Sequence, residues 1–143
     1  MIVAVQAEGS DNLTRNINEN NFEIKGSQTL ADSIAVDIPR NFYMAQDYLK
    51  KYNGEWITVS DKEILNASAL LSKNSGLFAE PAAAAAFAGV LKYQEKDKLE
   101  ANSSNLVILT GSGLKDVEVL KNHINLPKAI EPSIKNLLNI ITG

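Results

Sequence analysis

Short apolar runs recur along the chain and are separated by polar or amphipathic stretches. Residues 2–5 and 55–59 are rich in apolar and β-branched side chains, and residues 105–109 form an almost continuous apolar run. Such runs are typical of strands buried in a parallel sheet. Residues 7–29 are polar and turn-rich, which predicts a loop containing about one helical turn. The alternation of strands and helices indicates an α/β fold.

Two helices have clear boundary signals. Ser60 followed by Glu63 forms a capping-box pattern, in which each side chain can bond the backbone amide of the other residue. Gly76 lies where a left-handed C-terminal cap is expected. Pro81 suits the first turn of the next helix, whose alanine run at residues 82–86 favours close packing against other backbone.

Two further segments have weaker helical patterns. Asn41 can cap the first of them, which Gly54 ends, and the amphipathic second segment covers residues 134–141. No internal repeat or low-complexity linker interrupts the sequence. We therefore expect residues 1–143 to form a single α/β domain.

Composition narrows the classes of function. The chain has 143 residues, 45% of them apolar, so it can form a hydrophobic core. Its net charge of -3 argues against nucleic acid as a partner. The single histidine, His123, and the absence of cysteine leave no pattern for a metal site. The apolar run at residues 2–5 is too short for a membrane span and lacks the basic start and cleavage site of a signal peptide, and we expect a cytoplasmic protein without a membrane partner.

Two segments could carry chemistry. Residues 110–113, Thr-Gly-Ser-Gly, follow the apolar run 105–109, and ligands of open α/β sheets bind beyond the carboxyl ends of strands. Glu80 stands directly before Pro81 at a helix start. Each has a structural alternative, since short Gly-Ser turns are common and an acidic residue complements the positive end of a helix dipole. Glu8, just past the first strand, is also more often structural than functional.

Four motifs together resemble those of threonine synthases, in the order of that family. They are VAVQAEG at residues 3–9, LADSIAV at 30–36, GLFAEPA at 76–82 and LTGSGLKD at 109–116. The resemblance covers roughly residues 2–132. Related dehydratases share the Glu-Pro pair more than the Leu-Lys-Asp.

The resemblance implies a fold and a cofactor. Threonine synthases are fold type II pyridoxal-phosphate enzymes of the tryptophan-synthase-β-like family, and their cofactor lies between two α/β domains. This chain would be the C-terminal portion of the large domain, a three-layer unit with a mainly parallel sheet. By analogy Thr110 offers its hydroxyl to the pyridine nitrogen and Glu80 lies near the ring, while the adjoining wall is formed by Gly111, Ser112 and Gly113. The full-length enzyme converts O-phosphohomoserine and water to threonine and phosphate.

Two parts of the family pattern are absent from the chain. The Schiff-base lysine of a Ser-Phe-Lys-Asp-Arg-like segment and the Gly-rich loop for the cofactor phosphate both lie upstream in the family. Lys115 belongs to the Leu-Lys-Asp turn and is not assigned the Schiff base. The resemblance therefore implies no catalytic residue here, and we expect the chain alone to be inactive and to bind no pyridoxal phosphate.

The expected partner is the N-terminal half of the enzyme. Self-association is also expected, because the surface facing that half would include the small apolar residues 82–86. Two alternatives stay open at this stage. The chain could come from another fold type II lyase such as a threonine dehydratase, or it could be a non-catalytic module that dimerises or pairs with a complementary N-terminal chain through an exposed strand edge.

Overall fold

The structure is a computed structural model that describes residues 1–121 and 129–141. Two strands, six α-helices and three short 3-10 helices occur in these ranges. In chain order they are β1 (Val3–Ala7), η1 (Glu8–Ser10), α1 (Asn12–Asn16), η2 (Asp32–Ile34), α2 (Phe42–Lys51), β2 (Glu55–Val59), α3 (Asp61–Ser75), α4 (Pro81–Glu95), η3 (Gly113–Lys115), α5 (Val117–Lys121) and α6 (Ile134–Ile141).

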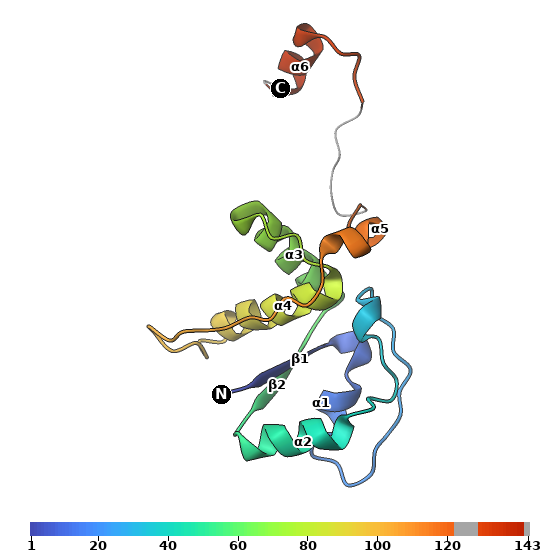
Figure 1. Cartoon of the computed structure of the whole chain (residues 1–143), viewed down its shortest axis with the longest axis vertical. Coiled ribbons are helices and arrows are strands. Elements are labelled where there is room, and N and C mark those ends of the chain that lie inside the picture. The colour runs from blue at the N-terminus through green and yellow to red at the C-terminus, as the bar shows by residue number, and fades with distance from the viewer. Residues whose placement is uncertain (122–128, 142–143) are drawn as a thin grey trace.

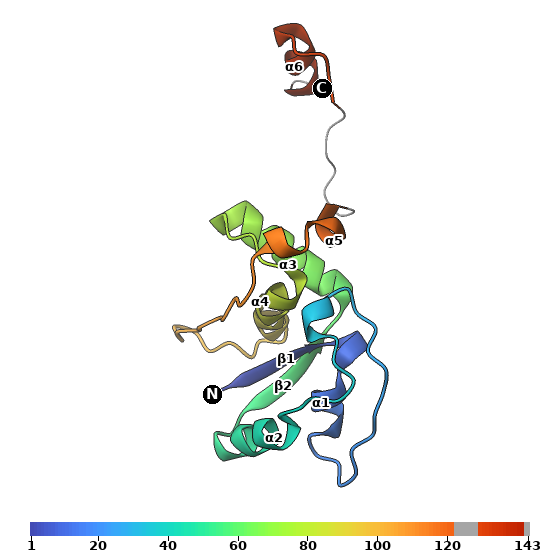
Figure 2. The same cartoon turned by 45° about the vertical axis from the view of Figure 1, so that its right-hand side comes forward.

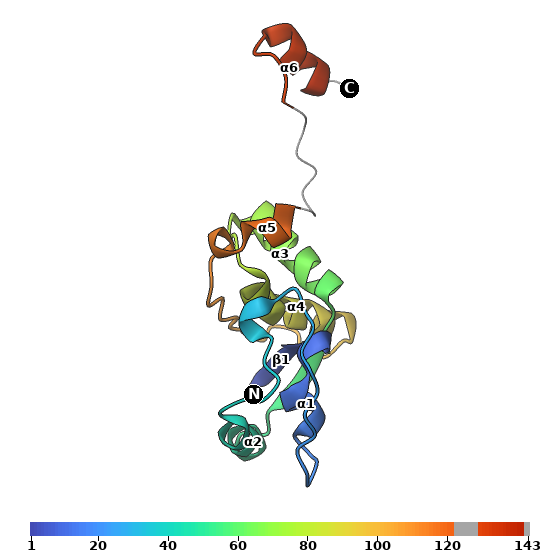
Figure 3. The ribbon, with the colours of Figure 1, turned by 90° about the vertical axis from the view of Figure 1, so that its right-hand side faces the viewer.

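The two strands form a parallel pair at the centre of the fold. Val3 lies opposite Glu55, and the register continues to Ala7 opposite Val59. Helix α4 packs on one face of this pair with α3 beside it, and α1 and α2 lie toward the other face (Figures 1 and 2). The side view shows the same layers, with the sheet between α4 and α2 (Figure 3). The predicted α/β fold with a parallel sheet is confirmed.

The capping box that the sequence predicts begins α3. The Ser60 hydroxyl accepts a hydrogen bond from the Glu63 amide at 3.3 Å, and the Glu63 carboxylate accepts one from the Ser60 amide at 2.6 Å. These bonds satisfy backbone donors that the first helical turn leaves without partners. Gly76 follows the helix with φ of 72°, the left-handed conformation that glycine adopts without strain. Both predicted ends of α3 are confirmed.

The alanine-rich helix α4 begins at Pro81, as predicted, and packs inside the chain. Ala83, Ala84 and Ala85 are all buried in the core with α3 and the strands. The expectation that residues 82–86 face a missing partner is therefore wrong for these three. Their small side chains fit the close helix packing that the fold needs, so the chain covers them itself.

Residues 105–109 are not a strand, which corrects the sequence prediction. They are extended, but the sheet of the described residues contains only β1 and β2. Leu106 is 90% exposed and Ile108 is 68% exposed. A strand needs a neighbour that accepts its backbone hydrogen bonds, and no described segment lies beside this one in that role. These residues have the apolar composition of a buried strand, but they pair with no strand of the described residues.

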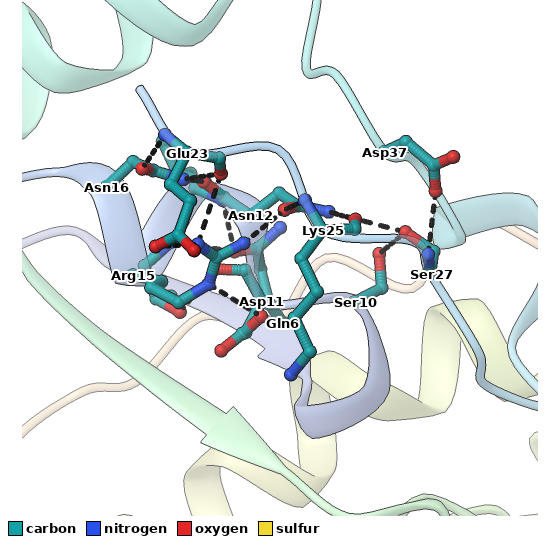
Figure 4. Close-up of polar contacts among 12 residues, drawn as sticks. Gln6, Ser10, Asp11, Asn12, Arg15, Asn16, Glu23, Lys25, Ser27 and Asp37 are labelled. Carbon is teal, nitrogen blue, oxygen red and sulfur yellow. Dashed lines mark hydrogen bonds and ion pairs between the residues drawn. The ribbon is translucent and has the colours of Figure 1, made fainter. Parts of the chain in front are cut away.

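A network of buried polar side chains orders the loop between α1 and α2 (Figure 4). The Asn12 side-chain amide donates to the carbonyl oxygens of Lys25 at 2.9 Å and Val36 at 3.1 Å. The Asn16 side-chain amide donates to the Glu23 carbonyl oxygen at 3.1 Å. Both asparagines are almost fully buried, and their side chains are hydrogen-bonded. They therefore supply hydrogen bonds that water would otherwise make to the backbone of this long loop.

The two weaker helices predicted from the sequence are both present. Asn41 occupies the cap position before α2, but its side chain makes no capping hydrogen bond. Helix α6 matches the predicted amphipathic segment, and its large apolar side chains are exposed. In residues 1–121 and 129–141, no helix is both long and apolar enough to cross a membrane.

Three charged side chains link α4 to the first turn of α3 and to the end of β1. Lys92 Nζ lies 3.0 Å from Glu63 Oε1 and 3.4 Å from Glu8 Oε1. Desolvation raises the pKa of Glu63, but the Ser60 amide and Lys92 outweigh it, so its net pKa is lowered below 4.5. Glu8 has the structural role expected of it, because it completes this cluster.

Replacing Gly89 of α4 by alanine should destabilise the protein. A Cβ at this position would lie 2.4 Å from Val5 Cγ2, which is closer than two carbons can pack. We expect a loss of about 1–3 kcal/mol in the free energy of unfolding, although alanine is the better helix former by about 1 kcal/mol. Urea unfolding measures the change. Gly26→Ala is the control, because no atom lies within 4 Å of its added Cβ; equal effects would contradict the close approach.

Replacing Glu63 by glutamine should cost stability at neutral pH and progressively less as the pH falls below 4.5. The folded carboxylate has a lowered pKa, so its charge stabilises the fold above 4.5 and is lost on protonation. Because the side chain is 34% exposed, solvent screening limits the effect to about 1 kcal/mol or less. Unfolding curves at several pH values test this. Glu118→Gln is the control, because it removes the carboxylate of an exposed ion pair and should cost little stability.

Candidate functional site

The turn at residues 110–113 packs against the segment that leads into α4. Ala79 and Ser112 form an antiparallel bridge. On either side of it, the Glu80 amide donates to the Gly111 carbonyl oxygen at 3.1 Å and the Gly113 amide donates to the Phe78 carbonyl oxygen at 2.8 Å. Two candidate segments that are about thirty residues apart in sequence therefore meet in one place.

Glu80 and Gly111 are in direct contact. A Cβ on Gly111 would lie 1.9 Å from Glu80 Oε1, so the glutamate side chain fills the space that another residue would need. Glu80 is only 7% exposed. It occupies the cap position of α4, but its side chain makes no capping bond. Within the described residues its carboxylate has no hydrogen-bond or ion-pair partner, but its position at the start of α4 still complements the positive end of the helix dipole.

A concavity of about 280 Å³ opens beside this contact. Thr110 is exposed at its edge, and its hydroxyl has no hydrogen bond within the described part of the chain. The Ser112 hydroxyl, by contrast, accepts the Leu114 amide at 3.3 Å and so caps η3. The lining comes from both segments and consists of Leu77, Phe78, Ala79, Leu109, Thr110, Gly111 and Ser112.

Phe78 is the part of this site that sequence reasoning missed. A Cβ on Gly113 would lie 2.7 Å from two carbons of the Phe78 ring, so the ring packs directly on that glycine. The sequence feature that could have identified Phe78 is its position two residues before Glu80 in the motif GLFAEPA at residues 76–82. Gly113 is buried under the ring and does not line the concavity, unlike Gly111 and Ser112.

The site combines apolar side chains with a few oxygen atoms. An aromatic ring and aliphatic groups can contact a planar ligand, a neutral hydroxyl can bond one edge of it, and a buried carboxylate lies behind the glycine turn. Lys115 is exposed on η3 and is not among the residues that line the concavity. His123 lies outside the described residues. The described residues contain no group of three metal-ligand side chains.

The fold and the site together define the class of protein. The structure is similar to maize serine racemase, with a TM-score of 0.65 and 20% identity over 85% of this chain and 37% of that one. It is also similar to the T.th. threonine deaminase, with a TM-score of 0.57 and 23% identity over 67% of this chain and 35% of that one. The fold is the α/β fold of these fold type II pyridoxal-phosphate enzymes.

The sequence gives the family. Residues 1–111 match the family described as pyridoxal-phosphate dependent enzyme, and the chain belongs to it. Three curated relatives are threonine synthases. The enzyme of Synechocystis sp. is 39% identical over 78% of this chain and 29% of its own length. The enzyme of a Bacillus sp. is 38% identical over 67% of this chain and 27% of its own length. The enzyme of Halalkalibacterium halodurans is 33% identical over 90% of this chain and 35% of its own length. The chain thus spans about a third of the length of these relatives.

Replacing Gly111 by alanine should displace the Glu80 carboxylate and cost about 1–3 kcal/mol in the free energy of unfolding, because both groups would occupy the same space. The double variant with Glu80→Ala should recover part of this loss, since the smaller side chain makes room for the methyl group. Urea unfolding of both single variants and the double variant gives the coupling energy, expected at about 0.5–3 kcal/mol. Strictly additive effects would show that the two residues are not in contact.

Proposed function

We propose that this chain is the C-terminal portion of a threonine synthase, an enzyme that converts O-phosphohomoserine and water to threonine and phosphate. The observation that carries the proposal is the contact between the Leu-Thr-Gly-Ser-Gly turn and the Phe-Ala-Glu-Pro segment. These are two of the four motifs shared with threonine synthases, and they meet around one concavity. The threonine synthases found among the curated relatives support the same reaction.

The residues of the concavity fit the ring of pyridoxal phosphate. Thr110 has an exposed hydroxyl without a partner among the described residues, and it would donate a hydrogen bond to the pyridine nitrogen. Such a neutral partner leaves the nitrogen unprotonated. Leu77 and Phe78 would cover the ring and exclude water, while the Glu80 side chain lies behind Gly111. When bound, the cofactor supplies an electron sink for the reaction.

This chain would supply only one side of the active site. It has neither the lysine motif nor the Gly-rich phosphate loop of the family, and it spans 27–35% of the three relatives. The groups that bond the cofactor covalently and hold its phosphate would come from the rest of the enzyme. We therefore propose that the chain is inactive alone and that its role is to bind and orient the ring.

The experiment uses a chimera in which the matched 78% of this chain replaces the corresponding segment of the Synechocystis threonine synthase. We expect the chimera to bind pyridoxal phosphate and to release phosphate from O-phosphohomoserine. Thr110→Val keeps the shape but removes the hydrogen bond, which should lower turnover by roughly tenfold to a hundredfold and change the visible spectrum of the bound cofactor.

Thr110→Ser is the matched control, because it keeps the hydroxyl and should keep most of the activity. If the valine variant retains both the turnover and the cofactor spectrum of the parent chimera, Thr110 does not contact the pyridine nitrogen. A chimera that binds the cofactor but acts on a different amino-acid substrate would instead contradict the assignment to threonine synthase.

A further inference from the structure

A buried serine of α3 bonds the backbone of the site from the side opposite the turn. Ser68 is only 1% exposed, and its hydroxyl donates a hydrogen bond to the Ala79 carbonyl oxygen at 2.9 Å. Ala79 is also buried, so both ends of this hydrogen bond are shielded from water. Because Ala79 directly precedes Glu80, the bond joins the middle of α3 to the segment that carries the buried carboxylate.

Ser68 uses its hydroxyl differently from the other serines of α3. A serine within a helix commonly donates to the carbonyl oxygen four residues earlier, as Ser72 does here at 3.0 Å and Ser75 at 2.7 Å. Ser68 instead donates to a residue outside the helix. Alanine would be the better helix former at this buried position, so the helix alone gives no reason for a serine there. The bond to Ala79 gives the hydroxyl a role.

The Ser68 bond and one bond of the turn meet in a single peptide group. The Ala79 carbonyl and the Glu80 amide belong to the same planar unit. The carbonyl accepts from Ser68, and the amide donates to the Gly111 carbonyl oxygen at 3.1 Å. A series of hydrogen bonds therefore runs from α3 across this peptide plane to the turn at residues 110–113. Hydrogen bonds in such a series strengthen one another, and the plane cannot rotate without breaking one of them.

This peptide plane determines where the groups of the site lie. The Glu80 side chain begins at the end of the plane and fills the space beside Gly111. Gly111 directly follows Thr110, which lies at the edge of the concavity. Rotation of the plane would move the Glu80 side chain and release the Gly111 carbonyl. The Thr110 hydroxyl would then have a less restricted orientation.

We propose that Ser68 is a positioning residue of this site, because its hydroxyl fixes the peptide plane between Ala79 and Glu80 and, through it, the turn that carries Thr110. Ser68 is not among the residues that line the concavity, so it acts through these groups and not by touching a ligand. The effect on the cofactor rests on the proposed function. The effect on the peptide plane is measurable in this chain without a cofactor.

Residue-resolved amide hydrogen exchange tests the peptide plane in this chain. Ser68→Ala leaves the buried Ala79 carbonyl without its donor, and we expect the Glu80 amide to exchange about tenfold faster or more. The Glu55 amide, which donates to the Ile2 carbonyl oxygen at 2.9 Å, reports opening of the whole fold and should change much less. Ser68→Cys keeps a side chain of similar shape but with a weak donor, so it should give an intermediate rate at Glu80.

Ile64→Val is the matched control for lost stability. Ile64 is also fully buried in α3, and this substitution removes a buried carbon but no hydrogen bond. It should leave the ratio of the Glu80 rate to the Glu55 rate unchanged. If Ser68→Ala raises both rates equally, Ser68 only supports the fold and the proposal is wrong. If Ser68→Ala does not fold, the same ratio in Ser68→Cys gives the decision.

A double-variant experiment in the chimera described above tests the link to Thr110. Ser68→Ala should lower turnover by about threefold to tenfold and change the visible spectrum of bound pyridoxal phosphate in the same direction as Thr110→Val. When Thr110→Val is already present, Ser68→Ala should have little further effect, because the hydroxyl that Ser68 positions is gone. A purely structural role predicts the same loss with and without the Thr110 hydroxyl, and that result would overturn the proposal.

The two experiments separate this proposal from the proposed function. A parent chimera that binds no pyridoxal phosphate would refute the proposed function, while the Glu80 exchange rate in this chain would still decide whether Ser68 fixes the peptide plane. An active chimera in which Ser68→Ala changes neither the Glu80 exchange rate nor the cofactor spectrum would refute the role of Ser68 and leave the proposed function intact.

Discussion

Helix α4 can lie against the sheet only because its inner face carries alanines and one glycine. At Gly89 there is no room for even a methyl group beside Val5 of β1. This close packing fixes both ends of the helix. The N-terminal end holds Glu80 against the turn at residues 110–113, and the C-terminal end brings Lys92 to Glu63. The site and the ion cluster therefore depend on one helix-to-strand contact.

The features that sequence could predict are those whose cause is local. The capping box of Ser60 and Glu63, the left-handed Gly76 and Pro81 at the first turn of α4 all appear as expected. Each depends on bonds or dihedral angles within a few residues, so the residue types alone carry the signal. The α/β pattern was predictable for the same reason, because the periods of strands and helices differ.

The wrong predictions concern contacts between distant segments. Residues 105–109 have the composition of a strand, but a strand also needs a partner, and composition does not say whether one is present. The alanine run was correctly expected to pack closely against other backbone, but the expectation that it also faces a missing partner is wrong for Ala83, Ala84 and Ala85, which this chain itself buries. The contacts of Glu80 with Gly111 and of Phe78 with Gly113 join parts of the chain about thirty residues apart. The motifs predicted which segments matter, but not these pairings.

Thr110 directly follows the extended segment 105–109, so the backbone of this segment determines where the Thr110 hydroxyl lies at the edge of the concavity. In the proposed threonine synthase, the part of the enzyme that this chain does not contain would cover the exposed Leu106 and Ile108 and exclude water from this edge. A hydrogen bond from that hydroxyl to a ligand gains strength where water is excluded. Docking of the remaining enzyme and binding of the cofactor would then strengthen each other by the same free energy, because coupling between two binding events is reciprocal.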